Sequence, residues 1–238
     1  MELEIENGVL KKLHMLYFGD FDIKDIVIPY GVTKIGYKAF ESYGCRIESI
    51  TIPDTVTEID DFAFDTCYLI KSITIPDSVI SIGNSVFEGC NRLENVTIGN
   101  SVISIGDRAF NSCFSLKSVT MGNSVTSIGK SAFTADDKLE SINFGNSLTS
   151  IGSFAFNGCH SLKSITLPDS VTEVGESAFE FCSGLTSLTL GKGLKVFGDY
   201  AFGDCENLKT ITLPSRDFKL DPKAFDDVSN FVFNYKEN

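Results

Sequence analysis

A phenylalanine recurs along this chain at almost constant spacing, and this period restricts the possible folds more than any other feature. The first interval between successive copies is 24 residues, and the other seven are each 23. Ala precedes the phenylalanine in every copy except one, where Val86 stands instead. This phenylalanine column comprises Phe40, Phe64, Phe87, Phe110, Phe133, Phe156, Phe179, Phe202 and Phe225. A fixed period of this length indicates stacked repeats, in which each unit buries its apolar side against its neighbours.

Other positions keep the same period, as the unit 162–182 (LKSITLPDSVTEVGESAFEFC) illustrates. Leu162, Ile165 and Leu167 end in an apolar–polar alternation rich in β-branched residues, which predicts a short strand. Pro168 then ends that strand, and Pro or Gly stands there in the other repeats. A second short extended piece follows. The segment around the Ala–Phe pair is too short for a long helix, and we expect one or two helical turns there.

The repeated pattern LxxIxIPxSVxxIGxxAFxxC resembles the BspA-like class of leucine-rich repeats over residues 23–228. The resemblance implies an α/β leucine-rich-repeat solenoid, a curved right-handed coil with a parallel sheet, short second strands and single helical turns. About nine 23-residue repeats would build it. Proteins of this class occur in bacteria and protists, many at the cell surface, and several are similar to adhesins. The resemblance implies no catalytic residues.

We expect residues 1–238 to form a single solenoid domain with a cap at each end. Residues 1–22 break the period, and Asn7-Gly8 lies between two alternating apolar segments, a pattern typical of a type I′ hairpin. Residues 23–213 hold the repeats. In the predicted C-terminal cap, 214–238, Asp221 replaces the usual Gly, and we expect 231–233 to add a last strand. The presence of both caps would make the chain an intact unit.

Charge and hydropathy exclude several classes of partner. The formal net charge is −12 and no basic cluster offsets it, so nucleic-acid binding and electrostatic binding to anionic membranes are not expected. No apolar run is long enough to span a bilayer, and the first residues do not resemble a secretory signal. As written, the sequence predicts a cytoplasmic monomer without membrane insertion. A cell-surface or secreted location would require that a signal or anchor has been trimmed.

A cysteine column lies three residues after the phenylalanine column. It comprises Cys67, Cys90, Cys113, Cys159, Cys182 and Cys205, while Cys45 is offset by an insertion. Because each lies at a core-facing position without a CxxC motif, we expect buried reduced thiols rather than disulfides or a metal site. One repeat carries Asp136 in place of the cysteine. We interpret Asp136-Asp137 as a surface loop, although this departure could also mark a site.

The outward positions of the first strands form the candidate ligand-facing strip, which we call the threonine strip. It comprises Thr51, Thr74, Thr97, Thr120, Asn143, Thr166, Thr189 and Thr212. A Ser, Asn or Thr two residues earlier lies on the same face, so parallel stacking would produce an uncharged surface lined by hydroxyls. The alternative is an ordinary strand surface, since Thr is a good strand former.

A charged column stands immediately before these strands. Its members are Glu48, Lys71, Glu94, Lys117, Glu140, Lys163, Thr186 and Lys209. Charge alternates through six successive repeats, and opposite charges on neighbouring strands favour stacking by about 0.2–1 kcal/mol per pair. We therefore interpret this column as a device that stabilises the stack and fixes its register.

The motifs of common enzymes and cofactor sites are absent from the sequence. Asp and Asn residues after the Pro or Gly are typical turn residues, and their spacing does not suit a calcium loop. We therefore expect no enzyme, no metal and no cofactor. The favoured function is an interaction module for a protein or glycan partner, adhesin-like by resemblance. The alternative is a structural repeat element of a larger assembly, without a dedicated ligand.

Overall fold

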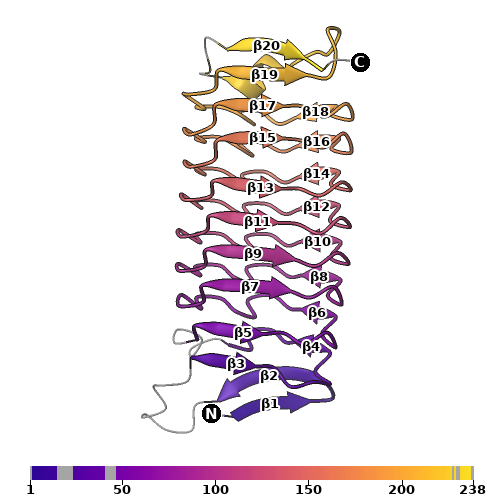
Figure 1. Cartoon of the computed structure of the whole chain (residues 1–238), viewed down its shortest axis with the longest axis vertical. Helices are drawn as coiled ribbons and strands as arrows, with labels where there is room; N and C mark the ends of the chain where they lie inside the picture. Colours follow the sequence, from indigo (N-terminus) through magenta and orange to yellow (C-terminus); the bar gives the residue numbers. More distant parts are fainter. Residues whose placement is uncertain (1, 15–23, 41–46, 227, 229–230, 237–238) are drawn as a thin grey trace.

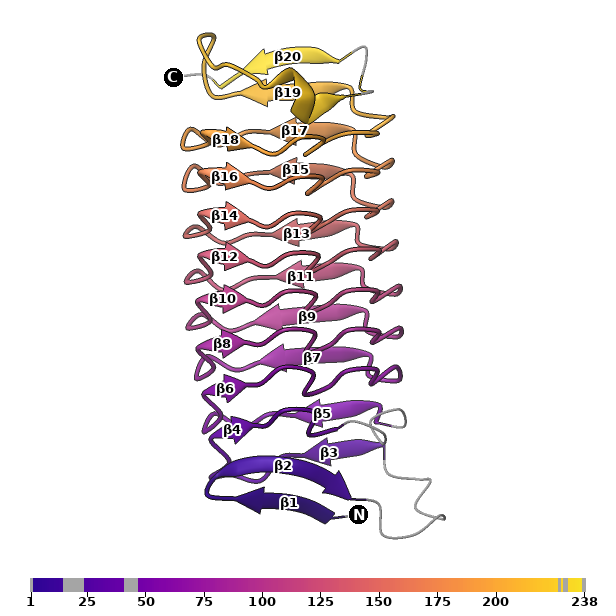
Figure 2. The same cartoon turned by 180° about the vertical axis from the view of Figure 1, so that it is seen from behind.

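The computed structural model describes residues 2–14, 24–40, 47–226, 228 and 231–236. The coils stack into a column that runs nearly straight in the views of Figures 1 and 2, with the two termini at opposite ends. Each coil contributes one strand to each of two opposite sides. The leucine-rich-repeat solenoid with parallel strands that the sequence predicts is therefore confirmed.

The first side carries the strands that the apolar–polar alternation predicts. They are β3 (Asp25–Val27), β5 (Ser49–Thr51), β7 (Ser72–Ile75), β9 (Asn95–Ile98), β11 (Ser118–Thr120), β13 (Ser141–Asn143), β15 (Ser164–Thr166), β17 (Ser187–Thr189), β19 (Thr210–Leu213) and β20 (Val232–Tyr235). They form three hydrogen-bonded groups: β3–β5, β7–β9–β11–β13 and β15–β17–β19–β20. Within each group the pairing is parallel and in register, so equivalent residues of successive coils are neighbours.

The opposite side is one continuous sheet of ten strands, although most of its strands have only two residues. The members are β1 (Glu2–Glu6), β2 (Val9–His14), β4 (Lys34–Ile35), β6 (Glu58–Ile59), β8 (Ser81–Ile82), β10 (Ser104–Ile105), β12 (Ser127–Ile128), β14 (Ser150–Ile151), β16 (Glu173–Val174) and β18 (Val196–Phe197). These are the short second strands that the repeat pattern predicts. Strands of two residues form here because the equivalent pairs of neighbouring coils lie beside them.

The Ala–Phe segments are tight turns instead of the single helical turns that we expected. Two residues before and two residues after the column phenylalanine, φ is positive, as at Arg108 (56°) and Ser112 (61°). The N–H groups of Arg108, Phe110 and Ser112 donate to carbonyls of the next coil at 2.8–2.9 Å. Hydrogen bonding to the next coil replaces the bonds within a helix. Among the described residues the only helix is η2 (Pro222–Phe225), a 3₁₀ turn.

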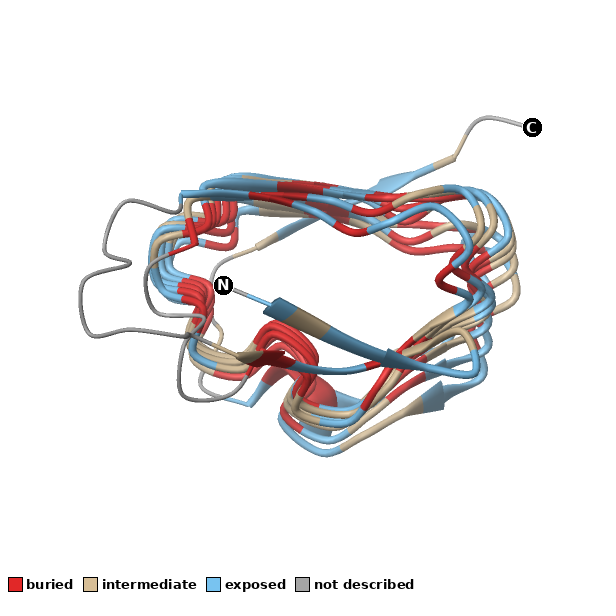
Figure 3. Ribbon diagram, turned by 90° about the horizontal axis from the view of Figure 1, so that it is seen from below, coloured by how far each residue is buried: buried red, intermediate tan, exposed pale blue. Residues whose placement is uncertain are grey.

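The core runs the length of the column, and Figure 3 shows that the buried positions recur at the same places in successive coils. The phenylalanine column is its axis. From Phe40 to Phe202 every ring is fully buried, and neighbouring rings stack with centroids 4.8–5.2 Å apart. This spacing combines the strand separation with favourable offset stacking of aromatic rings. The predicted burial of the column is confirmed.

The two ends of the column are built differently. At the N-terminal end β1 and β2 form an antiparallel hairpin, with φ positive at Asn7 (50°) and Gly8 (78°) as a type I′ turn requires. The predicted hairpin is thus confirmed, and β2 joins the first coil through β4. At the C-terminal end β20 adds a last parallel strand beside β19. The exact limits of both caps stay a prediction.

Candidate functional site

The threonine strip lies on the outward face of the first side, where the sequence places it. Its members from Thr51 to Thr166 are exposed, and Thr189 and Thr212 are half-buried. Residues between them, such as Val96 and Val119, point into the core. Strip members of successive strands pair directly, as Thr74 with Thr97 and Thr97 with Thr120. The strip therefore repeats at the strand separation, about 4.8 Å.

The strip differs from a second row of threonines on the opposite side of the column. In that row Thr126, Thr149 and Thr172 each donate their hydroxyl to a backbone carbonyl of the preceding coil, at 2.9–3.1 Å. Within the part of the chain that the structure describes, no threonine hydroxyl of the strip makes such a bond. The strip thus keeps hydrogen-bonding capacity for a ligand, while the opposite row uses its own to join coils.

The strip is interrupted between β13 and β15, contrary to the continuous surface that the sequence suggests. Asn143 replaces threonine here, and its side-chain oxygen accepts the N–H of Gly145 at 3.1 Å. Gly145 adopts a φ of +67°, which a residue with a side chain rarely takes. Phe144 also stands edge-on to Phe156, with ring centroids 5.8 Å apart. This local turn ends the parallel ladder and divides the strip into separate groups.

The charged column beside the strip forms ion pairs between neighbouring coils. Glu48 lies between Lys24 (3.0 Å) and Lys71 (3.7 Å), and Lys117 pairs with Glu94 at 2.7 Å. Hydrogen bonding to Lys24 lowers the pKa of Glu48, and hydrogen bonding to Lys117 lowers that of Glu94. All these groups are substantially exposed, so solvent screening keeps the contribution of each pair to stability small. The predicted pairing of opposite charges between neighbouring coils is confirmed for these pairs, and its role in fixing the register stays a prediction.

Asp136 is not in a surface loop, and our interpretation of it from the sequence is wrong. Its side chain is fully buried in the cysteine column. Oδ1 accepts the backbone N–H of Cys113 at 2.8 Å, whereas Oδ2 has no partner. Burial raises the pKa of this carboxyl well above its usual range, because the charged form loses its hydration. Because the coils stack in register, position 136 faces the core as the cysteines of the other coils do, even though it holds Asp.

The described members of the cysteine column are buried, reduced thiols that form no disulfide, as the sequence predicts. The Sγ atoms of Cys113, Cys159 and Cys182 donate to a phenylalanine carbonyl of the preceding coil at 3.2–3.3 Å. Burial raises the pKa of every thiol for which a shift is resolved, and that of Cys205 reaches about 12. Such thiols are inert at neutral pH. Cys45 lies outside the described residues.

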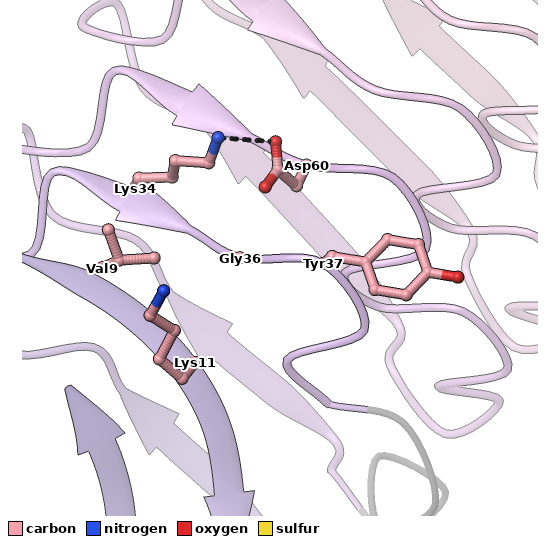
Figure 4. A pocket seen from close by; sticks show the side chains of 6 residues that line it. All are labelled: Val9, Lys11, Lys34, Gly36, Tyr37 and Asp60. Carbon is pink, nitrogen blue, oxygen red and sulfur yellow. Dashed lines mark ion pairs between the residues drawn. The ribbon is translucent and has the colours of Figure 1, made fainter. Parts of the chain in front are cut away.

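A pocket lies where the N-terminal hairpin meets the first two coils (Figure 4). Lys34 pairs there with Asp60 at 2.9 Å and with Glu58 at 2.8 Å. Hydrogen bonding to Glu58 and then to Asp60 raises the pKa of Lys34. Asp60 occupies a position that most other repeats fill with Gly. The pocket contains no nucleophile beside a base, and its ion pairs fasten the first coil to the second.

No cluster of three potential metal ligands occurs in residues 2–14, 24–40, 47–226, 228 and 231–236. Within the same described ranges, no helix reaches the length and apolarity that a membrane crossing requires. His160 is exposed, and its Nδ1 atom lies 2.9 Å from the Phe181 carbonyl oxygen.

The repeat pattern matches a family model described as the BspA type leucine rich repeat region. The match contains six copies and covers residues 11–139 and 126–235. The chain belongs to this family. Its BspA-type repeats are therefore those that build the coils, the threonine strip and the cysteine column. Among curated proteins, none matches the chain.

Solved structures of bacterial leucine-rich-repeat proteins share this fold. A T. pallidum leucine-rich-repeat protein has a TM-score of 0.63 and 27% identity, covering 84% of this BspA-type chain and 82% of its own. A leucine-rich cell surface protein from Faecalibacterium prausnitzii A2-165 has a TM-score of 0.54 and 28% identity. That match covers 87% of this chain but only 63% of the F. prausnitzii chain. A Eubacterium ventriosum protein at 20% identity shares the fold alone.

Proposed function

We propose that this chain is a non-catalytic interaction module that binds a protein or glycan partner on its threonine strip. The observation that carries the proposal is the contrast between the two rows of threonines. The strip presents hydroxyls that make no hydrogen bond within the described part of the protein, whereas the opposite row bonds to neighbouring coils. An extended sheet surface of this kind is the usual binding surface of a solenoid.

An adhesin-like role agrees with the family and with the F. prausnitzii relative, which is described as a cell surface protein. The threonine strip repeats one chemical group along a line, whereas catalysis requires different groups that converge at one point. The partner would instead meet the same polar groups several times along the column. Many weak contacts repeated at a fixed spacing favour a partner that is itself extended.

The experiment compares two triple variants with the unmodified chain. Thr97→Lys/Thr120→Lys/Thr166→Lys places three charges on the strip, and Thr126→Lys/Thr149→Lys/Thr172→Lys places three on the opposite side. Binding to immobilised extracellular-matrix proteins and mucin glycans is measured by surface plasmon resonance, with circular dichroism to verify folding. We expect only the strip variant to lose binding. Equal binding by both variants would exclude the strip as the site.

A second candidate function is a structural element that associates with other units without a dedicated ligand. The observation that favours it is the apolar surface at the C-terminal end, where Val232 is 62% exposed and Phe233 41%. Sedimentation tests this function only together with the binding assays, because it predicts assemblies in the absence of any ligand. The same binding assays would then show no saturable partner.

A further inference from the structure

The last strand of the column has an open edge. β20 pairs with β19 on one side only, and all four of its residues are exposed. The N–H groups of Val232 and Lys236 donate to β19 residues or their neighbours, at 2.8 and 3.0 Å. In a strand the intervening N–H groups, those of Phe233 and Tyr235, point the other way. They therefore form a free row of backbone donors and acceptors suited to pair with another strand.

The side chains of this strand make the end of the column apolar. Phe233 and Tyr235 pair with the buried Ile211 and Leu213, so they lie on the core side, yet they are 41% and 36% exposed. Phe231 stands edge-on to Phe233, with centroids 5.2 Å apart. In every other coil the next coil covers the equivalent residues. Here that cover is missing from the described structure.

The N-terminal end is protected in a different way. β1 crosses the end of the column antiparallel to β2, and Leu10 and Leu13 beneath it are buried. Glu2, Glu4 and Glu6 are exposed along β1. Acidic side chains on an edge strand repel a second acidic chain, which is a common protection against association. β20 has no charged residue between Val232 and Tyr235, although the chain has a net charge of −12.

We propose that two copies of this chain associate end to end through β20, related by a two-fold axis that passes beside Asn234. In this antiparallel register Phe233 faces Tyr235 of the second copy, and by symmetry Tyr235 faces Phe233 of the second copy. Asn234 faces its own equivalent on the outer surface. The two columns then form one continuous core, and the free backbone edge of each copy becomes paired.

The charges around the junction agree with a second copy as the occupant. Val232 faces Lys236 of the second copy, and the Lys236 ammonium already pairs with Asp169 of its own chain at 2.9 Å. The Arg216 guanidinium lies over the Tyr235 ring, 4.7 Å from its centroid, at the rim of the apolar surface. Within Val232–Lys236 no two like charges lie opposite one another in this register. The pairing thus replaces the monomer expected from the sequence and is independent of the threonine strip.

The experiment uses the two-fold axis itself. Asn234→Asp and Asn234→Lys each put two like charges opposite one another, and like charges opposed across strands weaken pairing. An equimolar mixture of the two variants puts opposite charges there. Molecular mass is measured by sedimentation velocity over a range of concentrations. Ile5→Asp, which adds a charge to the β1 edge at the other end, is the control.

We expect the unmodified chain and Ile5→Asp to shift from monomer to dimer as concentration rises. Each Asn234 variant alone should need a several-fold higher concentration to dimerise. The mixture of the two should dimerise at the same midpoint concentration as the unmodified chain. A chain that stays monomeric at every concentration would overturn the proposal. A dimer that is unaffected by the Asn234 variants would also overturn the proposal. So would a chain that binds a foreign peptide strand at β20 but never a second copy of itself.

Discussion

Replacing Asp136 by cysteine should stabilise the column at neutral pH, because it removes a buried carboxyl whose Oδ2 has no hydrogen-bond partner. The other described cysteines from Cys90 to Cys205 donate Sγ–H to a phenylalanine carbonyl of the preceding coil. At position 136 the equivalent acceptor is the carbonyl of Phe110. An ionised carboxylate has no proton to donate, and Oδ2 lacks any donor of its own. Only the protonated carboxyl can reproduce the bond of the cysteines.

The sign of the pH dependence follows from the raised pKa of Asp136. Folding raises this pKa above its unfolded value, so the folded protein holds a proton that the unfolded chain releases. The favourable contribution of Asp136 is fully present below the unfolded pKa, near 3.9. It is lost as pH rises towards the folded pKa, by up to about 1.4 kcal/mol per pH unit. The unmodified chain therefore gains stability relative to the variant in acid.

The free energy of unfolding measures this effect directly. At neutral pH the free energy of unfolding of Asp136→Cys should exceed that of the unmodified chain by about 1–3 kcal/mol, the usual penalty of a buried polar atom without a partner. The difference should shrink towards pH 4. Urea titrations followed by far-ultraviolet circular dichroism at pH 4 to 8 measure it, and Asp136→Asn is the control with the same shape but no titration. A difference independent of pH for both variants would refute the buried, proton-binding carboxyl.

Three further outcomes test the fold. Phe133→Ala removes a ring stacked between two others and should lower the free energy of unfolding by about 3–5 kcal/mol, whereas Phe114→Ala, at an exposed position, should change it little; equal losses would contradict the coil register. Ellman's reagent should leave the six described cysteines unmodified in the native chain and titrate them only after unfolding, so rapid native reaction of several thiols would show that the column is accessible. Gly122→Ala should destabilise the stack by about 1–3 kcal/mol, because the added Cβ would meet the Gly99 carbonyl oxygen at 2.2 Å, and an unchanged melting temperature would disprove that close approach.

Much of this protein follows from its sequence, because each coil repeats the same few core positions. The interval between column phenylalanines predicts the stack, and the spacing of the cysteines predicts their burial. Asn7-Gly8 predicts the hairpin that closes the N-terminal end, because both residues tolerate positive φ. These features depend on local backbone preferences and on which side chains avoid water. Both are visible in a single repeat.

Contacts between coils decided the rest. The Ala–Phe segments become turns because N–H groups such as that of Phe110 bond to the next coil, a partner 22 residues away that helix propensity cannot predict. Two rows of threonines look alike in the sequence, and only the stacked backbone shows which row has carbonyls within reach of its hydroxyls. Asp136 looks like a loop residue until its neighbours above and below enclose it. The sequence by itself determined which positions repeat, and the tertiary structure decided which polar groups remain free, because hydrogen bonds between coils engage most of the others.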